Sequence, residues 1–302
     1  MVNAPRFTVL MPTHARPDVI GYAIASVLAQ TVPDFELLIV GDGVSDDTRA
    51  VVAGFADPRI RFFDLPKGSG FGYANRNIAL REARSELIAL ASDDDLMLPD
   101  HLALMGAALA DPGSMLAYGQ SLWVSSDGIA GPDLTNLSQP DELARFMRQN
   151  SLAAGVLVYR RTAFAQPGPW PEHVAGGGDW WMWKDIIARH SLASLVAVRE
   201  VVQLHFSATR RRRRDGNAPR LRAWLKRADG GAHWPAALKL PIAAGEPPQA
   251  AYARALRDDP HWVPDMRRGV RDLTDHLALE ALARIEFWDR PRHIVRRLLG
   301  KA

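Results

Sequence analysis

Cysteine is absent from this chain of 302 residues. Its absence excludes disulfides, zinc–thiolate sites and cysteine nucleophiles. A bound metal would need oxygen or imidazole ligands, and such ligands point to magnesium or manganese. The kind of metal cofactor that the composition leaves open is therefore a hard divalent cation, Mn²⁺ or Mg²⁺.

Long apolar runs are missing as well. No uninterrupted stretch approaches the roughly 20 residues of a membrane-spanning helix, and the start, MVNAPRFTVLMPTHARP, lacks the apolar core of a signal peptide. With 47% hydrophobic and 24% charged residues, the composition is that of a soluble globular protein. We therefore expect a cytoplasmic protein that forms one large domain with an appendage, or two medium domains.

The chain carries little net charge, but its basic residues are concentrated in a few regions. The net charge is only +3, although the sequence pI is about 9.4. Much of the basicity lies in the arginine run 210–214 and in the C-terminal third. Such a run is usually a solvated face or loop, but it also suits anionic phosphates, nucleic acid or a membrane surface.

Short β-rich runs alternate with helical patterns in the N-terminal half. The predicted strands are 7–11, 35–40, 59–65 and 86–91, and the predicted helices are 18–30, 45–56 and 73–84. Continuous apolar strands separated by helices predict an α/β fold with a mostly parallel sheet covered on both faces. Ligands bind beyond the carboxyl ends of the strands in such sheets. The turns at those ends are 12–14, 41–47, 66–72 and 92–95.

The pattern is looser beyond residue 99. Helices are predicted at 102–110 and 179–190, and strands at 115–124, 155–160 and 194–206, the last of which returns to the sheet. After Arg214 the composition shifts toward Pro, Ala, Arg and Trp, and the chain ends in helical patterns at 266–288 and 291–300. We expect a first domain over 1–215 and a mostly helical extension over 216–302.

Three acidic features lie at or near predicted turns. Asp93, Asp94 and Asp95 follow a strand, and hard cations prefer such carboxylate ligands, although a solvated helix cap explains the triplet equally well. Asp42 stands between two glycines, where it can approach a base or ribose, or simply form a tight turn. Asp179 follows three glycines and opens an aromatic-rich helix, which suits either a general base or an N-cap.

Glycine-rich turns do not supply a dinucleotide fingerprint. That fingerprint needs G-x-G-x-x-G at a strand–helix turn. Both GDGVSD (41–46) and GSGFGY (68–73) lack the last glycine. A nicotinamide enzyme is therefore disfavoured.

The motifs occur in an order that is typical of a known family. VLMPTHARPDVIGYAIASVLAQTVPDFELLIVGDGVSDDT is followed by YANRNIAL, then SDDDLMLPD, then GGGDWWMW. The chain resembles the family 2 glycosyltransferases of the GT-A fold over roughly residues 6–206. The resemblance implies a Rossmann-like, mostly parallel sheet flanked by helices, and the helical C-terminal extension lies beyond the part that it covers. It also implies inverting transfer of a sugar from a nucleoside-diphosphate sugar to an acceptor hydroxyl.

Site residues carry over from the resemblance position by position. It implies Asp179 as the catalytic base and places the donor contacts at Pro12, Thr13, His14, Asp42, Lys67, Arg76, Asp93 and Asp94. It implies metal ligation by Asp94, with Asp95 beside it, and His205 is either a further metal or diphosphate contact or a structural histidine at a strand end. Asp94 is the first choice for the metal. The arginine run 210–214 either folds over the diphosphate or forms a solvated loop.

Three positions depart from the family pattern. Gly41 replaces the first of two aspartates after the second strand, and Ser92 stands where the acidic loop usually begins with aspartate. Gly178 stands where glutamate often precedes the base. Which of the three consecutive aspartates bind the metal is therefore open.

The implied partners are a nucleotide-sugar donor, with a UDP-sugar as the first candidate, and a saccharide or lipid-linked acceptor. The expected process is cell-surface polysaccharide or glycoconjugate synthesis. The amphipathic pattern at 291–300 suits packing on the same domain, a homodimer, or peripheral contact with the inner face of the membrane. The absence of membrane spans and of a Q-x-x-R-W motif favours a non-processive enzyme.

Two other functions compete with this one. A sugar-1-phosphate nucleotidyltransferase shares the sheet and the metal carboxylates, but it needs a Gly-rich basic loop that MPTHARPD does not supply. A nucleic-acid-binding protein would use residues 210–214, but no aromatic stacking platform accompanies them. We expect no nucleic-acid partner.

Overall fold

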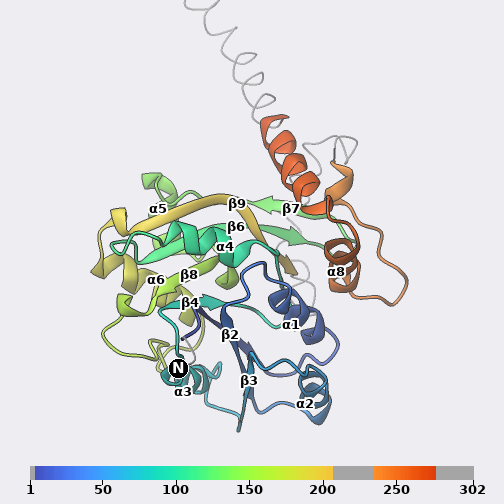
Figure 1. Ribbon diagram of the computed structural model, residues 1–302. Coiled ribbons are helices and arrows are strands. Elements are labelled where there is room, and N and C mark those ends of the chain that lie inside the picture. Colours follow the sequence, from blue (N-terminus) through green and yellow to red (C-terminus); the bar gives the residue numbers. More distant parts are fainter. Residues whose placement is uncertain (1–3, 207–233, 277–302) are drawn as a thin grey trace, which may run out of the picture.

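A nine-stranded sheet forms the centre of the computed structural model, which describes residues 4–206 and 234–276 (Figure 1). The strands are β1 (Phe7–Thr13), β2 (Phe35–Asp42), β3 (Ile60–Leu65), β4 (Leu87–Leu90), β5 (Leu96–Met97), β6 (Leu116–Val124), β7 (Ala130–Asp133), β8 (Leu157–Arg160) and β9 (Leu195–Phe206). The helices are α1 (Ile20–Leu28), α2 (Asp46–Ala53), α3 (Tyr73–Arg81), α4 (His101–Ala108), α5 (Pro140–Arg148), α6 (Gly178–Arg189) and α8 (Pro248–Asp258), and residues 262–276 are also helical. The strand order is β3-β2-β1-β4-β8-β6-β9-β5, with β7 paired to β6.

The N-terminal half of the sheet is parallel. β1 pairs with β2 and β4, and β2 pairs with β3, all in the same direction. Each predicted strand and helix up to residue 91 is present within a few residues of its predicted ends. Ser45 caps α2, because its hydroxyl oxygen accepts a hydrogen bond from the Thr48 backbone N–H at 3.3 Å. The predicted α/β sheet is confirmed in this half.

The second half of the sheet is mixed. β8 runs antiparallel to β4 and β6, whereas β6 and β9 pair in parallel. The prediction that 194–206 returns to the sheet is confirmed. Four elements, β5, β7, α5 and α8, were not predicted from the sequence. β5 has only two residues. β7 has the sequence AGPD, and glycine and proline are unusual within a strand.

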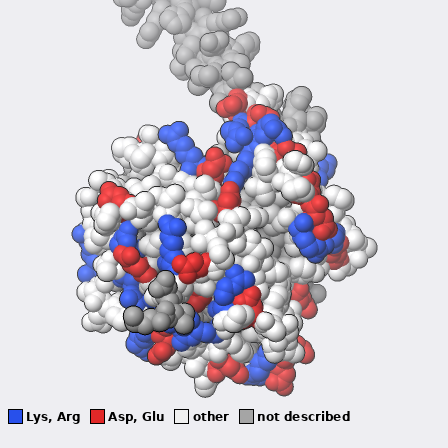
Figure 2. All heavy atoms as spheres, in the orientation of Figure 1, with Lys and Arg blue, Asp and Glu red and all other residues white. Residues whose placement is uncertain are grey.

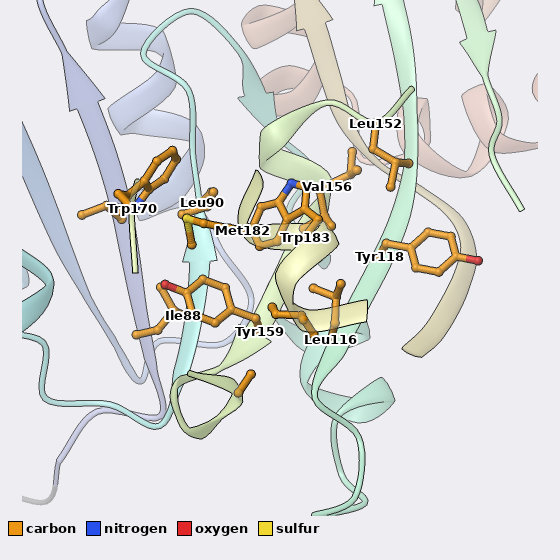
Figure 3. Close-up of a cluster of buried hydrophobic side chains, with 14 of the residues drawn as sticks. Ile88, Leu90, Leu116, Tyr118, Leu152, Val156, Tyr159, Trp170, Met182 and Trp183 are labelled. Atoms are coloured by element: carbon orange, nitrogen blue, oxygen red, sulfur yellow. The ribbon is translucent and has the colours of Figure 1, made fainter. Parts of the chain in front are cut away.

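Alternate residues of the strands point into cores on opposite faces of the sheet. Leu10 and Leu38 pack with residues of α3 and α6, whereas Val9 and Leu37 pack with residues of α1, α2 and α4. Figure 3 shows the first of these cores, in which Met182 and Trp183 of α6 lie against Leu90 and Tyr159. The sheet is therefore covered on both faces, as a buried parallel sheet requires.

A third core joins the C-terminal segment to the far half of the sheet. Tyr252 and Trp262 pack with Leu204 and Phe206 of β9. Arg267 donates hydrogen bonds to both carboxylate oxygens of Asp100 at 2.6 and 2.9 Å. The segment 234–276 thus packs directly on the sheet, and α8 lies beside α1 in Figure 1.

Three predicted features lie outside residues 4–206 and 234–276. The domain boundary near residue 215, the arginine run 210–214 and the pattern at 291–300 all lie there. No helix within residues 4–206 and 234–276 is long and apolar enough to cross a membrane. On the face drawn in Figure 2, basic and acidic side chains are interspersed.

Candidate functional site

The carboxyl ends of the parallel strands border two adjoining hollows. The smaller hollow, of about 280 Å³, is lined by Pro12, Thr13, His14, Arg16, Asp42, Lys67, Phe71, Arg76 and Asp93, among others. The larger, of about 780 Å³, is lined by Asp94, Asp133, Asn150, Ser151, Asp179 and His205, among others, and shares Arg16, Phe71, Arg76 and Asp93 with the first. Ten of the eleven predicted site residues therefore border one continuous depression. Asp95 lines neither hollow.

Asp42 organises the wall of the smaller hollow. One of its carboxylate oxygens accepts hydrogen bonds from the Gly68 N–H and from Asn75 Nδ2, each at 2.7 Å, and the other oxygen pairs with Lys67. His14 Nδ1 lies 2.7 Å from the Asp42 carbonyl oxygen. The loop before α3 is thus fastened to the end of β2, and the predicted donor residues of both elements are brought together.

Asp93 and Asp94 both pair with the guanidinium of Arg16, a residue that was not predicted from the sequence. Arg16 pairs with Asp94, and its Nε lies 3.3 Å from Asp93 Oδ1. Burial, together with the charge of Asp94, raises the pKa of Asp93 to about 7, while Arg16 opposes the shift. The only sequence signal for Arg16 was its place three residues after the end of β1. A single arginine near a strand end is too common to stand out.

Asp95 faces β9 instead of the hollow. Its Oδ2 lies 2.8 Å from His205 Nδ1 and accepts a hydrogen bond from Gln203 Nε2 at 2.6 Å. Its Oδ1 accepts the Phe206 backbone N–H at 2.9 Å. Asp95 therefore orients His205, and Nε2 is the ring nitrogen that remains for a ligand on the side of the larger hollow.

Arg76 lies between the two hollows. Its guanidinium carbon is 4.9 Å from the ring centre of Tyr73 and 4.5 Å from that of Trp170. Its Nε is buried and has no hydrogen-bond partner among the described residues. Burial lowers the pKa of this group from its ordinary value, and the charges of Asp179, Asp42 and Asp93 oppose that shift. The arrangement holds a positive charge against aromatic rings at the junction of the hollows.

Asp179 lines the larger hollow from the first turn of α6. Its Oδ2 is 3.4 Å from Asn150 Nδ2. Burial raises the pKa of Asp179, and the charge of Arg76 opposes the shift. Asn150 was not identified in the sequence, because it lies in an irregular segment before a single helical turn and belongs to no motif. Asp179 is thus a carboxylate of raised basicity facing the larger hollow.

The donor set fits a hard divalent cation, although it is not a complete cage. Among residues 4–206 and 234–276, no three His, Asp or Glu side chains converge as a metal site. Asp94 and His205 nevertheless line the same hollow. The Asp95–His205 contact is the carboxylate–imidazole pair that commonly orients a metal-binding histidine. Two protein ligands completed by substrate phosphate oxygens are typical of magnesium sites.

A family model for glycosyl transferase family 2 matches residues 8–186. The chain belongs to this family. The predictions of a family 2 glycosyltransferase and of its GT-A fold are confirmed. The matched range contains every predicted site residue except His205.

Two curated relatives illustrate the likeness. The UDP-Glc:alpha-D-GlcNAc-diphosphoundecaprenol beta-1,3-glucosyltransferase WfgD of Escherichia coli is 24% identical over 188 residues, which cover 62% of this chain and 72% of WfgD. The succinoglycan biosynthesis protein ExoO of Rhizobium meliloti is 36% identical over 126 residues, or 42% of this chain and 36% of ExoO. The aligned part is thus most of the first relative and about a third of the second.

Solved glycosyltransferases share the fold. TarS 1-349 of S. aureus, in complex with UDP-GlcNAc, matches with a TM-score of 0.55 at 19% identity, over 67% of this chain and 58% of that chain. The mannosyltransferase PcManGT of Pyrobaculum calidifontis, in complex with GDP-Man and Mn²⁺, matches with a TM-score of 0.51 at 17% identity. That match covers 100% of this chain and 89% of PcManGT.

Proposed function

We propose that this family 2 glycosyltransferase transfers a sugar from a nucleoside-diphosphate sugar to an acceptor hydroxyl, with inversion at the anomeric carbon and without processive chain extension. The observation that carries the proposal is the placement of Asp179. It faces the same hollow as Asp93, Asp94 and His205, with Arg76 between the two sides. The proposed base and the proposed diphosphate-binding groups thus line one space of a size that can hold a sugar, which supports the proposal.

Asp179 is the proposed general base. It removes the proton from the acceptor hydroxyl as that oxygen forms a bond to the anomeric carbon. The bond from this carbon to the diphosphate oxygen breaks, and the nucleoside diphosphate leaves with the electron pair. A raised pKa brings a carboxylate closer to the basicity that general-base catalysis needs.

The smaller hollow is the proposed nucleotide site. Pro12, Thr13, His14 and Asp42 border the space for the base and ribose, and Lys67 lies at its edge. Arg76 and Arg16 carry positive charge at its junction with the larger hollow, where the diphosphate would lie. A guanidinium is suited to phosphate because it offers several donors in one plane.

Asp94 and His205 are the proposed ligands of Mn²⁺ or Mg²⁺, and Asp95 orients His205. When bound, the cation would neutralise the charge that develops on the leaving diphosphate. Because Arg16 pairs with Asp94, cation binding requires Arg16 to release that carboxylate or to share it. Arg16 would then be available to the phosphate oxygens.

A UDP-sugar is our first candidate donor, because TarS is seen with UDP-GlcNAc and WfgD is named for UDP-Glc. The proposed acceptor is a saccharide or a lipid-linked saccharide, as in the name of WfgD. The proposed setting is surface polysaccharide or glycoconjugate synthesis at the cytoplasmic side of the membrane, with peripheral contact through 291–300. Homodimer formation stays a proposal as well.

The reaction is tested by incubating the protein and Mn²⁺ with α-linked UDP-, GDP- and dTDP-sugars and a mixture of saccharide acceptors. We expect one donor class to give a β-linked product by NMR, together with release of the nucleoside diphosphate. An α-linked product would contradict inversion. Formation of a nucleoside triphosphate and a sugar 1-phosphate from a nucleotide sugar and pyrophosphate would instead support the nucleotidyltransferase alternative.

A further inference from the structure

Tyr73 connects the nucleotide side of the depression to the base-bearing helix. Its phenol oxygen accepts a hydrogen bond from the Gly178 backbone N–H at 2.9 Å. Gly178 is the first residue of α6 and directly precedes Asp179. The contact joins two segments that are 105 residues apart in the chain.

This hydrogen bond caps the N-terminus of α6, which has no capping side chain of its own. The first N–H groups of a helix have no partner within the helix and are usually satisfied by a capping side chain. At α6 the cap position is Gly177, which has a left-handed backbone with φ 63° and no side chain. The Tyr73 hydroxyl therefore replaces the missing cap from another part of the chain.

The ring of Tyr73 also fixes the position of this first turn. A Cβ atom at Gly178 would lie 2.6 Å from Cζ, the ring carbon that bears the hydroxyl, so the backbone of α6 rests directly against that end of the ring. The ring itself is held between Phe71 and Trp170, at centroid distances of 6.1 and 5.5 Å. Tyr73 is 5% exposed and has little freedom to move.

Two further residues of α3 also connect the nucleotide side of the depression to the segment that leads to α6. Asn77, one turn after Tyr73, exchanges two hydrogen bonds of 2.9 Å with the backbone of Trp170. Asn75 instead donates to the Asp42 carboxylate at 2.7 Å. A short helix thus fastens the loop that leads to Asp179 while it holds the wall of the nucleotide site.

We propose that Tyr73 is a positioning residue for the transfer step: it fixes the first turn of α6 and so holds Asp179 in register with the donor site. The proposal rests on the proposed role of Asp179 as the base. A displacement of about 1 Å can cost a reaction of this kind on the order of 100-fold. Tyr73 borders the larger hollow, but its hydroxyl is engaged by the Gly178 N–H and contributes to turnover through the position of Asp179.

Tyr73→Phe tests this directly, because it removes the hydroxyl and keeps the ring stacked. We expect kcat to fall by about tenfold or more, with the affinity for nucleoside diphosphate and Mn²⁺ within about twofold of wild type. Tyr118→Phe is the matched control. Tyr118 is also buried, and its hydroxyl accepts a backbone N–H, from Leu137, at 2.9 Å. It lines neither hollow, so the control variant should lose similar thermal stability but keep kcat.

Gly178→Ala tests the same contact from the other side, because the added methyl group must displace the ring or the helix. It should lower kcat with the same preserved nucleotide affinity. The inference is overturned if Tyr73→Phe keeps kcat within twofold of wild type, or if Tyr118→Phe loses as much activity. Asp179→Asn, measured in parallel, separates the two proposals: if it still transfers sugar, the proposed base is wrong, whatever Tyr73→Phe does.

Discussion

The two sides of the depression are built differently. On the nucleotide side, the carboxylates are already engaged by neighbouring groups: Asp42 by Lys67, Gly68 and Asn75, and Asp94 by Arg16. On the base side, Asp179 accepts a long side-chain hydrogen bond from Asn150 Nδ2, at 3.4 Å. The nucleotide-side carboxylates are thus held by several charged and polar partners, whereas the base-side carboxylate is largely buried with one weak side-chain hydrogen bond.

This difference has a chemical consequence. A frame of hydrogen-bonded charges keeps its shape before substrate arrives, and such preorganisation avoids the cost of ordering groups during binding. A base that is not paired with a neighbouring cation keeps an oxygen lone pair for the proton of an incoming hydroxyl. Binding and proton transfer are therefore expected to be separable by mutation.

The largest expected effect is on the base side. Asp179→Asn keeps the size of the side chain but removes its basicity, so transfer should fall by about 10³-fold, within the usual range for general-base catalysis. Calorimetry should show unchanged affinity for the nucleoside diphosphate. A variant that binds nucleotide normally and still transfers sugar would remove Asp179 from the mechanism.

A smaller loss is expected on the nucleotide side, but there binding and transfer should fall together. Asp94→Asn removes the charge that would hold the cation, and we expect transfer to fall by about 10²-fold, as for loss of one electrostatic stabiliser. The affinity for nucleotide in Mn²⁺ should fall in the same variant. If only turnover changed, the division between the two sides would be wrong.

The interaction between Arg76 and Asp179 should affect the pH dependence of kcat. Asp179 acts as a carboxylate, so its raised pKa predicts that activity is lost as the pH falls through a value above the ordinary 3.9 or so of aspartate. Arg76→Gln removes a positive charge that opposes this shift. The acid limb of kcat should then move to higher pH by about one unit. A limb that stays in place would show that Arg76 and Asp179 are not coupled.

The smallest effect concerns the C-terminal segment. Gln249 of α8 is buried and donates to the Asp94 carbonyl oxygen at 3.0 Å. Gln249→Met should weaken Mn²⁺-dependent nucleotide binding by about fivefold, equivalent to one hydrogen bond of about 1 kcal/mol. Gln120→Met is the control, because Gln120 is buried, lines neither hollow and also donates to a backbone carbonyl oxygen, that of Thr135, at 3.0 Å, while its Oε1 accepts the Thr135 N–H at 2.7 Å. An equal loss in both variants would mean that Gln249 only stabilises the fold.

The nucleotide side was largely predictable from the sequence. Short turns follow β1, β2 and β4, and parallel strands place their carboxyl ends along one edge. Local spacing therefore indicated where Thr13, Asp42 and Asp93 would lie. Arg16 was missed because its pairing with Asp94 spans 78 residues and leaves no local pattern.

The base side was predictable only as a single motif. GGGDWW indicated Asp179, but its surroundings come from the irregular segment at Asn150 and from Tyr73, which is distant in sequence. Asp95 shows the same limit, because its three contacts on β9 distinguish it from its neighbours only in three dimensions. Spacing predicts which groups meet at a sheet edge but not the direction in which each one points.

The most direct test of this account is calorimetric titration of the full-length protein with UDP, GDP and dTDP, each with and without Mn²⁺. We expect that one nucleotide binds and that Mn²⁺ strengthens its binding markedly in wild type and in Asp179→Asn, but not in Asp94→Asn. If no nucleotide binds in a metal-dependent way to the wild-type protein, the proposed donor site is contradicted.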